Sequence, residues 1–307
     1  MFLPRLQICH TPGGSVTVDE QLIPTRDRCN FPQYIPSKPE KYGLKIFWCC
    51  HSVTAYPLNS EVYLGRQLEA ASAAEDKNRI CNLVKRLVHP WINAGRTNTT
   101  DNYFTSTELV EDLLCVQTTL VGNIRRNRQE IPRELQPDPR RPEQSSIFCF
   151  DRQLILVSYV PKKRHAVILL SSFHHDVSID FERKKKPEII LYYNETKGGV
   201  DRMDQMVETY SCKRKIKRWP MTFFFNIVDV GTIAAFIIWT TKNPSWNEKK
   251  RHCQRLFLMQ LGYDLVEPHI DRRQQQPQAR QRDVRMAMQA IGQTITTSQP
   301  DTVSSTS

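Results

Sequence analysis

The chain has 307 residues, with 43 Lys+Arg against 32 Asp+Glu, which gives a formal net charge of +11. Its hydrophobic content of 39% and aromatic content of 9% exclude a globally disordered or fibrous chain. The length allows about two domains, each large enough to bury a core. The basic excess favours an anionic partner, either nucleic acid or an acidic membrane surface.

The cysteines indicate a reducing compartment. Nine of them are scattered along the chain, and no two form a C-x-x-C pair. We therefore expect neither a disulfide framework nor a structural zinc site built on such pairs. The first 14 residues contain no long apolar run, so the sequence predicts no signal peptide.

The first hundred residues predict the beginning of an α/β fold. Ser15–Asp19 is typical of a strand that ends in a carboxylate, and Thr97–Asp101 predicts a second strand of the same kind. In the chain between these two strands, Tyr42–Cys50 and Val62–Gly65 are predicted to form an antiparallel pair. The apolar spacing over Ile80–Val88 is that of a helix with one buried face.

The stretch 116–193 is expected to be β-rich. Thr105 or Ser106 can cap a short helix over Thr107–Leu114 just before it. The strands predicted after that helix are Val116–Val121, Ile147–Phe150, Leu154–Tyr159, Val167–Ser171 and Ile189–Tyr193. We interpret 116–193 as an insertion subdomain that divides a core made of 1–115 and 194–270.

The segment Phe223–Trp239 is apolar enough to suggest a membrane span. Asn226, Asp229 and Thr232 recur in it every three residues and would form a polar stripe on a helix. A lipid-facing helix would place Asp229 near mid-bilayer at a cost of roughly 2.5–3.5 kcal/mol. This favours a buried helix of a soluble protein. Residues 271–307 are predicted to be disordered, with one short helix around Val284–Ile291.

Four aspartates lie where predicted elements begin or end. Asp19 and Asp101 each follow a β-branched strand, and Asp201 and Asp204 share one face at the start of a helix. Two Mg²⁺ or Mn²⁺ ions about 3.5–4 Å apart need oxygen ligands from separate rigid elements, as these are. For each acid alone, a structural role at a turn or at a helix N-terminus stays open.

Basic runs are the second signal for a nucleic-acid partner. The residues predicted to contact DNA phosphates are Arg125, Arg126, Arg128, Lys213, Arg214, Lys215, Lys217 and Arg218, and Trp219 could stack on a base. A solvated surface with Trp219–Pro220 as a core anchor remains the alternative. Lys197–Gly198–Gly199 superficially resembles a phosphate cradle. It lacks the G-x-x-x-x-G-K-[ST] spacing, so we expect no phosphate loop there.

Eight stretches, in order along the chain, resemble the piggyBac transposase superfamily and its host-domesticated relatives. The most specific is YYNETKGGVDRMDQM over Tyr192–Met206. The others are Thr17–Pro24, Arg28–Ile46, Thr100–Ser106, Arg125–Pro132, Phe148–Asp151, Leu169–Ser172 and Lys217–Met221.

This resemblance implies a ribonuclease H-like core, with a mixed sheet flanked by helices and interrupted by a β-rich insertion. It implies Asp19, Asp101 and Asp201 as catalytic residues that hold two Mg²⁺ or Mn²⁺ ions, with Asp204 as an additional aspartate at the metal site. Such a site would activate water to free a DNA 3′-OH, which attacks the complementary strand and later a target that is preferentially TTAA. DNA as the partner, a homodimer and a nuclear location are implied too, without a membrane or a small-molecule substrate.

The sequence also departs from the family. Only 18 residues precede Asp19, and no cysteine follows Ile270, so we expect the transposon-end recognition modules to be missing. His51 stands where the family is expected to carry an acid. A second hypothesis is therefore a non-catalytic DNA- or chromatin-binding remnant, domesticated or truncated. A third is a basic membrane-surface protein, which would bind anionic vesicles instead of DNA.

Overall fold

The computed structural model describes residues 2–36, 38–65, 73–274 and 282–290. The chain divides into two compact units, Met1–Pro244 and Ser245–Ser307. The second unit contains α7 (Cys253–Gln274) and α8 (Arg282–Ala290). The predicted disordered tail is thus helical over 271–274, and α8 matches its predicted short helix. The other tail residues lie outside the described part of the chain.

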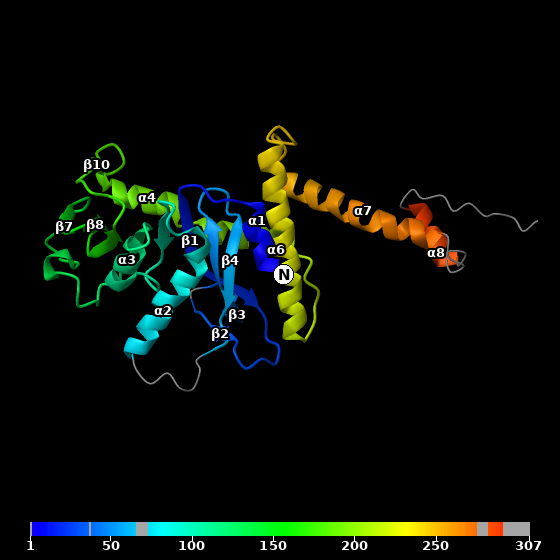
Figure 1. Ribbon diagram of the computed structural model, residues 1–307, viewed down its shortest axis with the longest axis horizontal. Helices are drawn as coiled ribbons and strands as arrows, with labels where there is room; N and C mark the ends of the chain where they lie inside the picture. Colours follow the sequence, from blue (N-terminus) through cyan, green and yellow to red (C-terminus); the bar gives the residue numbers. More distant parts are fainter. Residues whose placement is uncertain (1, 37, 66–72, 275–281, 291–307) are drawn as a thin grey trace, which may run out of the picture. The chain divides into compact units, whose positions relative to one another are not determined.

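A mixed sheet of nine strands forms the centre of the first unit (Figure 1). Strand β1 pairs antiparallel with β3 and parallel with β5, and β5 pairs parallel with β6. β4 pairs antiparallel with the other edge of β3, where β2 also pairs. These strands are β1 (Ser15–Pro24), β2 (Gln33–Tyr34), β3 (Tyr42–His51), β4 (Pro57–Val62), β5 (Thr97–Thr100) and β6 (Thr119–Asn123). The predicted ribonuclease H-like arrangement is confirmed.

Three antiparallel strands extend the same sheet beyond β6. They are β9 (His165–Ser171), β8 (Leu154–Lys162) and β7 (Ser146–Asp151), and all three were predicted. A separate two-stranded sheet pairs β10 (Ile179–Asp180) with β11 (Lys186–Pro187). The subdomain limits 116 and 193 stay a prediction, since the strands between them continue the core sheet.

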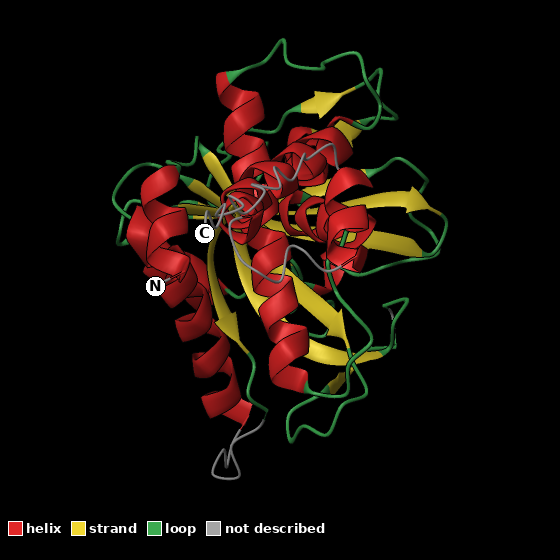
Figure 2. Ribbon diagram, turned by 90° about the vertical axis from the view of Figure 1, so that its right-hand side faces the viewer, coloured by secondary structure: helices red, strands yellow, loops and turns green. Residues whose placement is uncertain are grey.

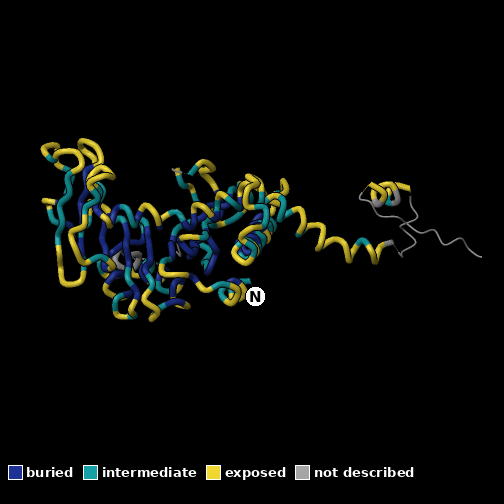
Figure 3. The backbone as a smooth tube through the Cα atoms, turned by 90° about the horizontal axis from the view of Figure 1, so that it is seen from above, coloured by how far each residue is buried: buried dark blue, intermediate teal, exposed yellow. Residues whose placement is uncertain are grey.

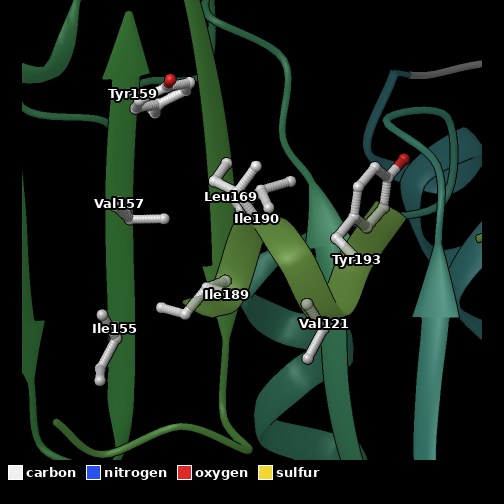
Figure 4. Close-up of a cluster of buried hydrophobic side chains, with 8 residues drawn as sticks. All are labelled: Val121, Ile155, Val157, Tyr159, Leu169, Ile189, Ile190 and Tyr193. Atoms are coloured by element: carbon white, nitrogen blue, oxygen red, sulfur yellow. The ribbon is translucent and has the colours of Figure 1, made fainter. Parts of the chain in front are cut away.

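The predicted strand at Ile189–Tyr193 was wrong. These residues lie in α4 (Glu188–Thr196), whose buried positions include Ile189, Ile190, Tyr193 and Thr196. That spacing places one helical face against the sheet, where it packs with β-strand residues such as Val157 and Leu169 (Figure 4). A short apolar run does not distinguish a strand from a buried helix, and the tertiary contact decided.

Helices pack on both sides of the strands (Figure 2). α2 (Ala73–Val88) and α3 (Thr107–Leu114) contact each other and the strands β3, β4 and β6. α4, α5 (Gly199–Thr209) and α6 (Trp219–Lys242) form a second group along β1, and α1 (Phe2–Cys9) contacts β4. Consecutive residues of β1, Thr17 and Val18, are both fully buried because both faces of the strand are covered. Figure 3 shows buried backbone gathered in the interior of the first unit. Ser106 caps α3 by accepting a hydrogen bond from the Leu109 amide at 3.2 Å, as predicted.

Helix α6 is the one described helix long and apolar enough to span a membrane by length and composition. Its Asn226 and Asp229 are nevertheless only 6% and 5% exposed. Asp229 accepts hydrogen bonds from the Ser211 hydroxyl at 2.6 Å and the Cys212 amide at 2.9 Å. The predicted polar stripe therefore packs against protein, which supports the interpretation of α6 as a core helix.

Candidate active site

Three alternate residues of β1 reach the layer formed by α4, α5 and α6. Side chains two apart on a strand share one face, so Thr17, Asp19 and Gln21 point the same way. Thr17 donates from Oγ1 to the Thr196 carbonyl at the end of α4, at 2.6 Å. Gln21 donates from Nε2 to Asp204 Oδ1 in α5, at 2.7 Å. Asp19 lies between these two anchors.

The parallel register places Asp101 beside Asp19. Val18 of β1 pairs with Thr100 of β5, and each of these residues is followed by an aspartate. The prediction that Asp19 ends its strand was wrong, because β3 continues to pair with β1 as far as Pro24. Asp101 does follow the last residue of β5, as predicted.

Gly199 sets the position of Asp201. A Cβ on Gly199 would lie 2.7 Å from Thr17 Oγ1 and 3.0 Å from Thr17 Cβ, which is closer than packed atoms allow. Glycine therefore lets the start of α5 lie directly against β1. Asp201 then falls in the first turn of α5.

Asp19, Asp101 and Asp201 all line one pocket of about 260 Å³. Its other charged residues are Glu20, Lys38 and Lys197, and its walls are formed by Thr17, Val18, Thr99, Thr100 and Tyr193. The three predicted catalytic acids are thus brought together from β1, the end of β5 and the start of α5.

The pocket is lined by more acidic than basic side chains, and it is partly shielded from solvent. Burial, and then the charges of Glu20 and Asp201, raise the pKa of Asp19 to about 8, while the Glu20 amide, which donates to Asp19 Oδ1 at 2.8 Å, opposes the shift. The Asp201 side chain is 67% exposed, and its carboxylate lies 3.8 Å from the Lys38 ammonium. A cation in the pocket would relieve this repulsion.

The donor set suits a hard divalent ion, because carboxylate oxygens are the ligands that Mg²⁺ and Mn²⁺ prefer. Within the described residues, however, no three His, Cys, Asp or Glu side chains lie close enough together to hold one ion. The acids therefore fit a metal in chemistry and in location around the pocket.

Asp204 is set behind the pocket instead of lining it. It accepts from the buried Gln21, whose Oε1 in turn accepts from the Trp48 indole at 2.9 Å and the Asn226 amide at 3.2 Å. Burial raises the pKa of Asp204 to about 6, while the Gln21 hydrogen bond opposes the shift. This network ties β1, β3, α5 and α6 together next to the acids.

The first predicted DNA-binding run lies near Asp101. Arg125, Arg126 and Arg128 follow β6, and Arg125 donates from Nε to Asn102 Oδ1 at 3.4 Å. Since Asn102 follows Asp101 directly, this basic loop adjoins the acidic pocket.

The second run connects α5 to α6 and is exposed at Lys213, Arg214, Lys215, Lys217 and Arg218. The Lys213 ammonium donates to the Pro24 carbonyl. Trp219 begins α6, and its ring lies edge-on to Phe31 with centroids 5.2 Å apart. This contact with Phe31 supports the alternative in which Trp219 anchors the core. Stacking of Trp219 on a DNA base stays a prediction.

Sequence reasoning missed Gln21, Lys38 and Glu20, and it discounted Lys197. Gln21 and Glu20 follow Asp19 in the same motif, but only the strand geometry separates their roles. Lys38 comes from a distant turn, so no spacing in the sequence connects it with the acids.

This geometry defines a class of protein: a ribonuclease H-like sheet with aspartates on β1, after β5 and at the start of α5 is the core of DDE-type transposases. The family described as Transposase IS4 matches residues 2–236. The chain belongs to this family, and within it to the piggyBac transposase superfamily. Family members generally use divalent metal ions.

Curated relatives and a solved structure agree with this assignment. The human "PiggyBac transposable element-derived protein 3" is 24% identical over 229 residues, which cover 68% of this chain and 38% of that protein. The human "Chimeric ERCC6-PGBD3 protein" is 24% identical over 68% of this chain and 21% of its own length. A piggyBac transposase in a synaptic complex with hairpin DNA matches 98% of this chain and 61% of that one, with 38% identity and a TM-score of 0.82. The chain thus spans less than two thirds of each relative.

Proposed function

We propose that this chain forms a DNA strand-cleaving core of the piggyBac type. The observation that carries the proposal is the meeting of Asp19, Asp101 and Asp201 around one pocket, from three separate elements. Asp19, Asp101 and Asp201 would hold the pair of Mg²⁺ or Mn²⁺ ions, and Asp204 would support α5 from behind the pocket.

The reaction is hydrolysis of a DNA phosphodiester. When bound, the ions polarise the phosphate and activate water. The water oxygen forms a bond to phosphorus, and the 3′ oxygen leaves with a proton as a free 3′-OH. That hydroxyl can then attack the complementary strand. The exposed Arg125 and Arg126, the half-buried Arg128 and the segment Lys213–Trp219 would contact the DNA backbone on either side.

The test is incubation of purified protein with supercoiled plasmid and Mn²⁺, alongside Asp101→Ala. Nicking by the wild-type chain and its loss in the variant would support the proposal, and weak non-specific nicking is the expected level. If wild type and variant leave the plasmid equally intact, strand cleavage by this chain is excluded. Asp138→Ala, at an exposed acid outside the pocket, is the matched control.

A non-catalytic DNA-binding role is the second candidate. It is favoured by the absence, in the described part of the chain, of three acidic, His or Cys side chains gathered on one ion position, and by the Lys38–Asp201 contact. This role predicts salt-sensitive DNA binding that is unchanged by Asp101→Ala and by chelators. Binding to anionic vesicles in place of DNA would favour the membrane-surface alternative instead.

A nuclear location and a homodimer are part of the proposal, because the family acts on DNA and the solved relative is a synaptic complex. A fluorescent fusion of the full chain should accumulate in the nucleus. Sedimentation with and without duplex DNA should give a mass of two chains per complex, and a strictly monomeric complex would refute the dimer.

A further inference from the structure

The acidic pocket also carries two lysines that the metal-binding role does not use. Lys38 and Lys197 line it together with Asp19, Asp101 and Asp201. They come from different elements: Lys38 from the turn between β2 and β3, and Lys197 from the C-terminal end of α4. A pocket of carboxylates alone would repel a DNA phosphate, so these cations change what it can accept.

The turn that carries Lys38 joins β2 to β3. β2 pairs with β3 through Gln33 with Gly43 and Tyr34 with Tyr42. Inside the turn, the Ile35 amide donates to the Lys41 carbonyl at 2.8 Å, and the Lys38 amide donates to the Ile35 carbonyl at 3.2 Å. The turn is therefore closed by hydrogen bonds at two levels, and it presents Lys38 to the pocket.

The Lys38 side chain is only 24% exposed. Its ammonium donates to the Glu20 carbonyl at 3.3 Å and lies 3.8 Å from Asp201 Oδ1. An ammonium has three donors, so these two contacts leave one for a further acceptor. A metal ion on Asp201 would compete with Lys38 for that carboxylate and would leave the ammonium able to bind another anion.

Lys197 is held over an aromatic ring. Its ammonium lies 5.5 Å from the ring centroid of Tyr193, which is buried and forms a wall of the same pocket. The attraction between a cation and a ring face keeps the flexible lysine near the pocket. Gly198 and Gly199 follow, so the next backbone segment is the start of α5, which carries Asp201.

We propose that Lys38 and Lys197 form a phosphate-binding pair that holds the non-bridging oxygens of the DNA phosphodiester between the acids. The inference rests on the proposed function and deepens it, because it names the DNA phosphate as the part of the substrate that the pocket binds. Lys38 has two states: it pairs with Asp201 when the metal is absent and with phosphate when the metal is present. A purely structural Lys38 would only neutralise Asp201.

The test measures DNA binding and metal binding separately from cleavage. Lys38→Met and Lys197→Met are compared with Lys41→Met, an exposed lysine of the same turn that lines another pocket. Affinity for a fluorescent duplex is measured by anisotropy in Ca²⁺ over a range of salt concentrations. We expect each pocket variant to bind DNA ~3–10-fold more weakly than the wild-type chain. The slope of log affinity against log salt concentration should become shallower by about one. Lys41→Met should lose less than about twofold in DNA affinity.

Mn²⁺ affinity, measured by calorimetry without DNA, gives the second readout. Lys38→Met should bind Mn²⁺ more tightly than the wild-type chain because a competing cation is gone, while it binds DNA more weakly. Lys38→Arg should retain DNA binding. All variants are first required to keep the wild-type thermal midpoint, and Lys38→Gln replaces Lys38→Met if that variant unfolds.

The outcomes separate the two proposals. If the lysine variants weaken DNA binding while the wild type and Asp101→Ala nick equally little, the phosphate site stands and strand cleavage fails. If the wild type nicks DNA and the lysine variants bind and nick like Lys41→Met, the phosphate site is overturned and strand cleavage stands. Equal DNA affinity for all variants also overturns it.

Discussion

The side-chain amide of Gln21 donates a hydrogen bond to Asp204 at 2.7 Å, joining residues 183 positions apart in the sequence. Gln21 is 1% exposed, and its amide also meets Asn226 of α6 and Trp48 of β3. A buried amide with its partners satisfied fixes elements relative to one another. Here it fixes α5, and with it Asp201, against the strand that carries Asp19.

Replacing Gln21 with leucine should destabilise the chain strongly. The change leaves Asp204, Trp48 and Asn226 without their buried partner, which should cost about 2–4 kcal/mol of unfolding free energy. Urea denaturation measures this. Gln205→Leu, on the exposed side of α5, is the control and should change stability by less than ~0.5 kcal/mol. Equal effects of the two changes would contradict a structural role for the network.

Gly199→Ala should move α5 away from β1. The added methyl group would lie 2.7 Å from Thr17 Oγ1, so we expect a loss of about 1–3 kcal/mol and weaker Mn²⁺ binding. The neighbouring Gly198 offers a matched control, because a Cβ there meets nothing closer than Arg202 Nε at 4.0 Å. Thermal melts and calorimetry on both variants check this, and an unchanged Gly199→Ala would refute the close approach.

The contribution of Asp19 to metal-free stability should fall as the pH rises from about 4 to about 8. Burial, Glu20 and Asp201 raise the pKa of Asp19 from 3.8 in the unfolded chain to about 8 in the fold. The folded state then binds a proton that the unfolded state has lost, so this contribution of Asp19 is fully present below pH 3.8 and declines as the pH rises through 8. Asp19→Asn should flatten this decline and raise the midpoint temperature of thermal unfolding at neutral pH by ~2–4 °C. A steeper decline in the variant would contradict the assignment.

Mn²⁺ binding at pH 7 should release about one proton, because a ligand carboxylate must be ionised and Asp19 is protonated in the metal-free fold. Calorimetric titrations in two buffers of different ionisation enthalpy measure the released proton. At pH 9 the release should vanish. An identical heat in both buffers at pH 7 would show that Asp19 is already ionised.

His51 should make the fold sensitive to acid. It is 8% exposed, and its Nδ1 lies 3.4 Å from His10 Nε2 and 2.8 Å from the Thr54 hydroxyl. Burial, and then the charges of His10 and Arg202, together lower its pKa from 6.5 to about 4. The contribution of His51 to stability is therefore fully present above about pH 6.5 and is lost as the pH falls towards 4.

Denaturation between pH 4 and 7 tests this role of His51. His51→Gln should lose less stability than the wild-type chain over this interval. His165→Gln, at an exposed histidine, should follow the wild-type curve. If His51→Gln also follows it, the acid sensitivity arises elsewhere.

Much of the first unit could be predicted from the sequence, because its elements have strong local signals. The helix at α2 follows from apolar spacing, and the cap of α3 follows from Ser106. Strands β7, β8 and β9 were predicted within a few residues. The failures are informative: Ile189–Tyr193 has strand-like residues but lies in a helix, since a run this short has no period of its own.

The sequence by itself determined which chemistry was available: four aspartates, two basic runs and a family motif, each recognisable from its own short stretch of the chain. Only the tertiary structure decided which of these groups meet. Val18 pairing with Thr100 puts Asp19 beside Asp101, Gly199 lets α5 bring Asp201, and a distant turn adds Lys38. The physical reason is that local preferences act over a few residues, whereas the pocket is formed by strand register and close packing between segments up to 183 residues apart.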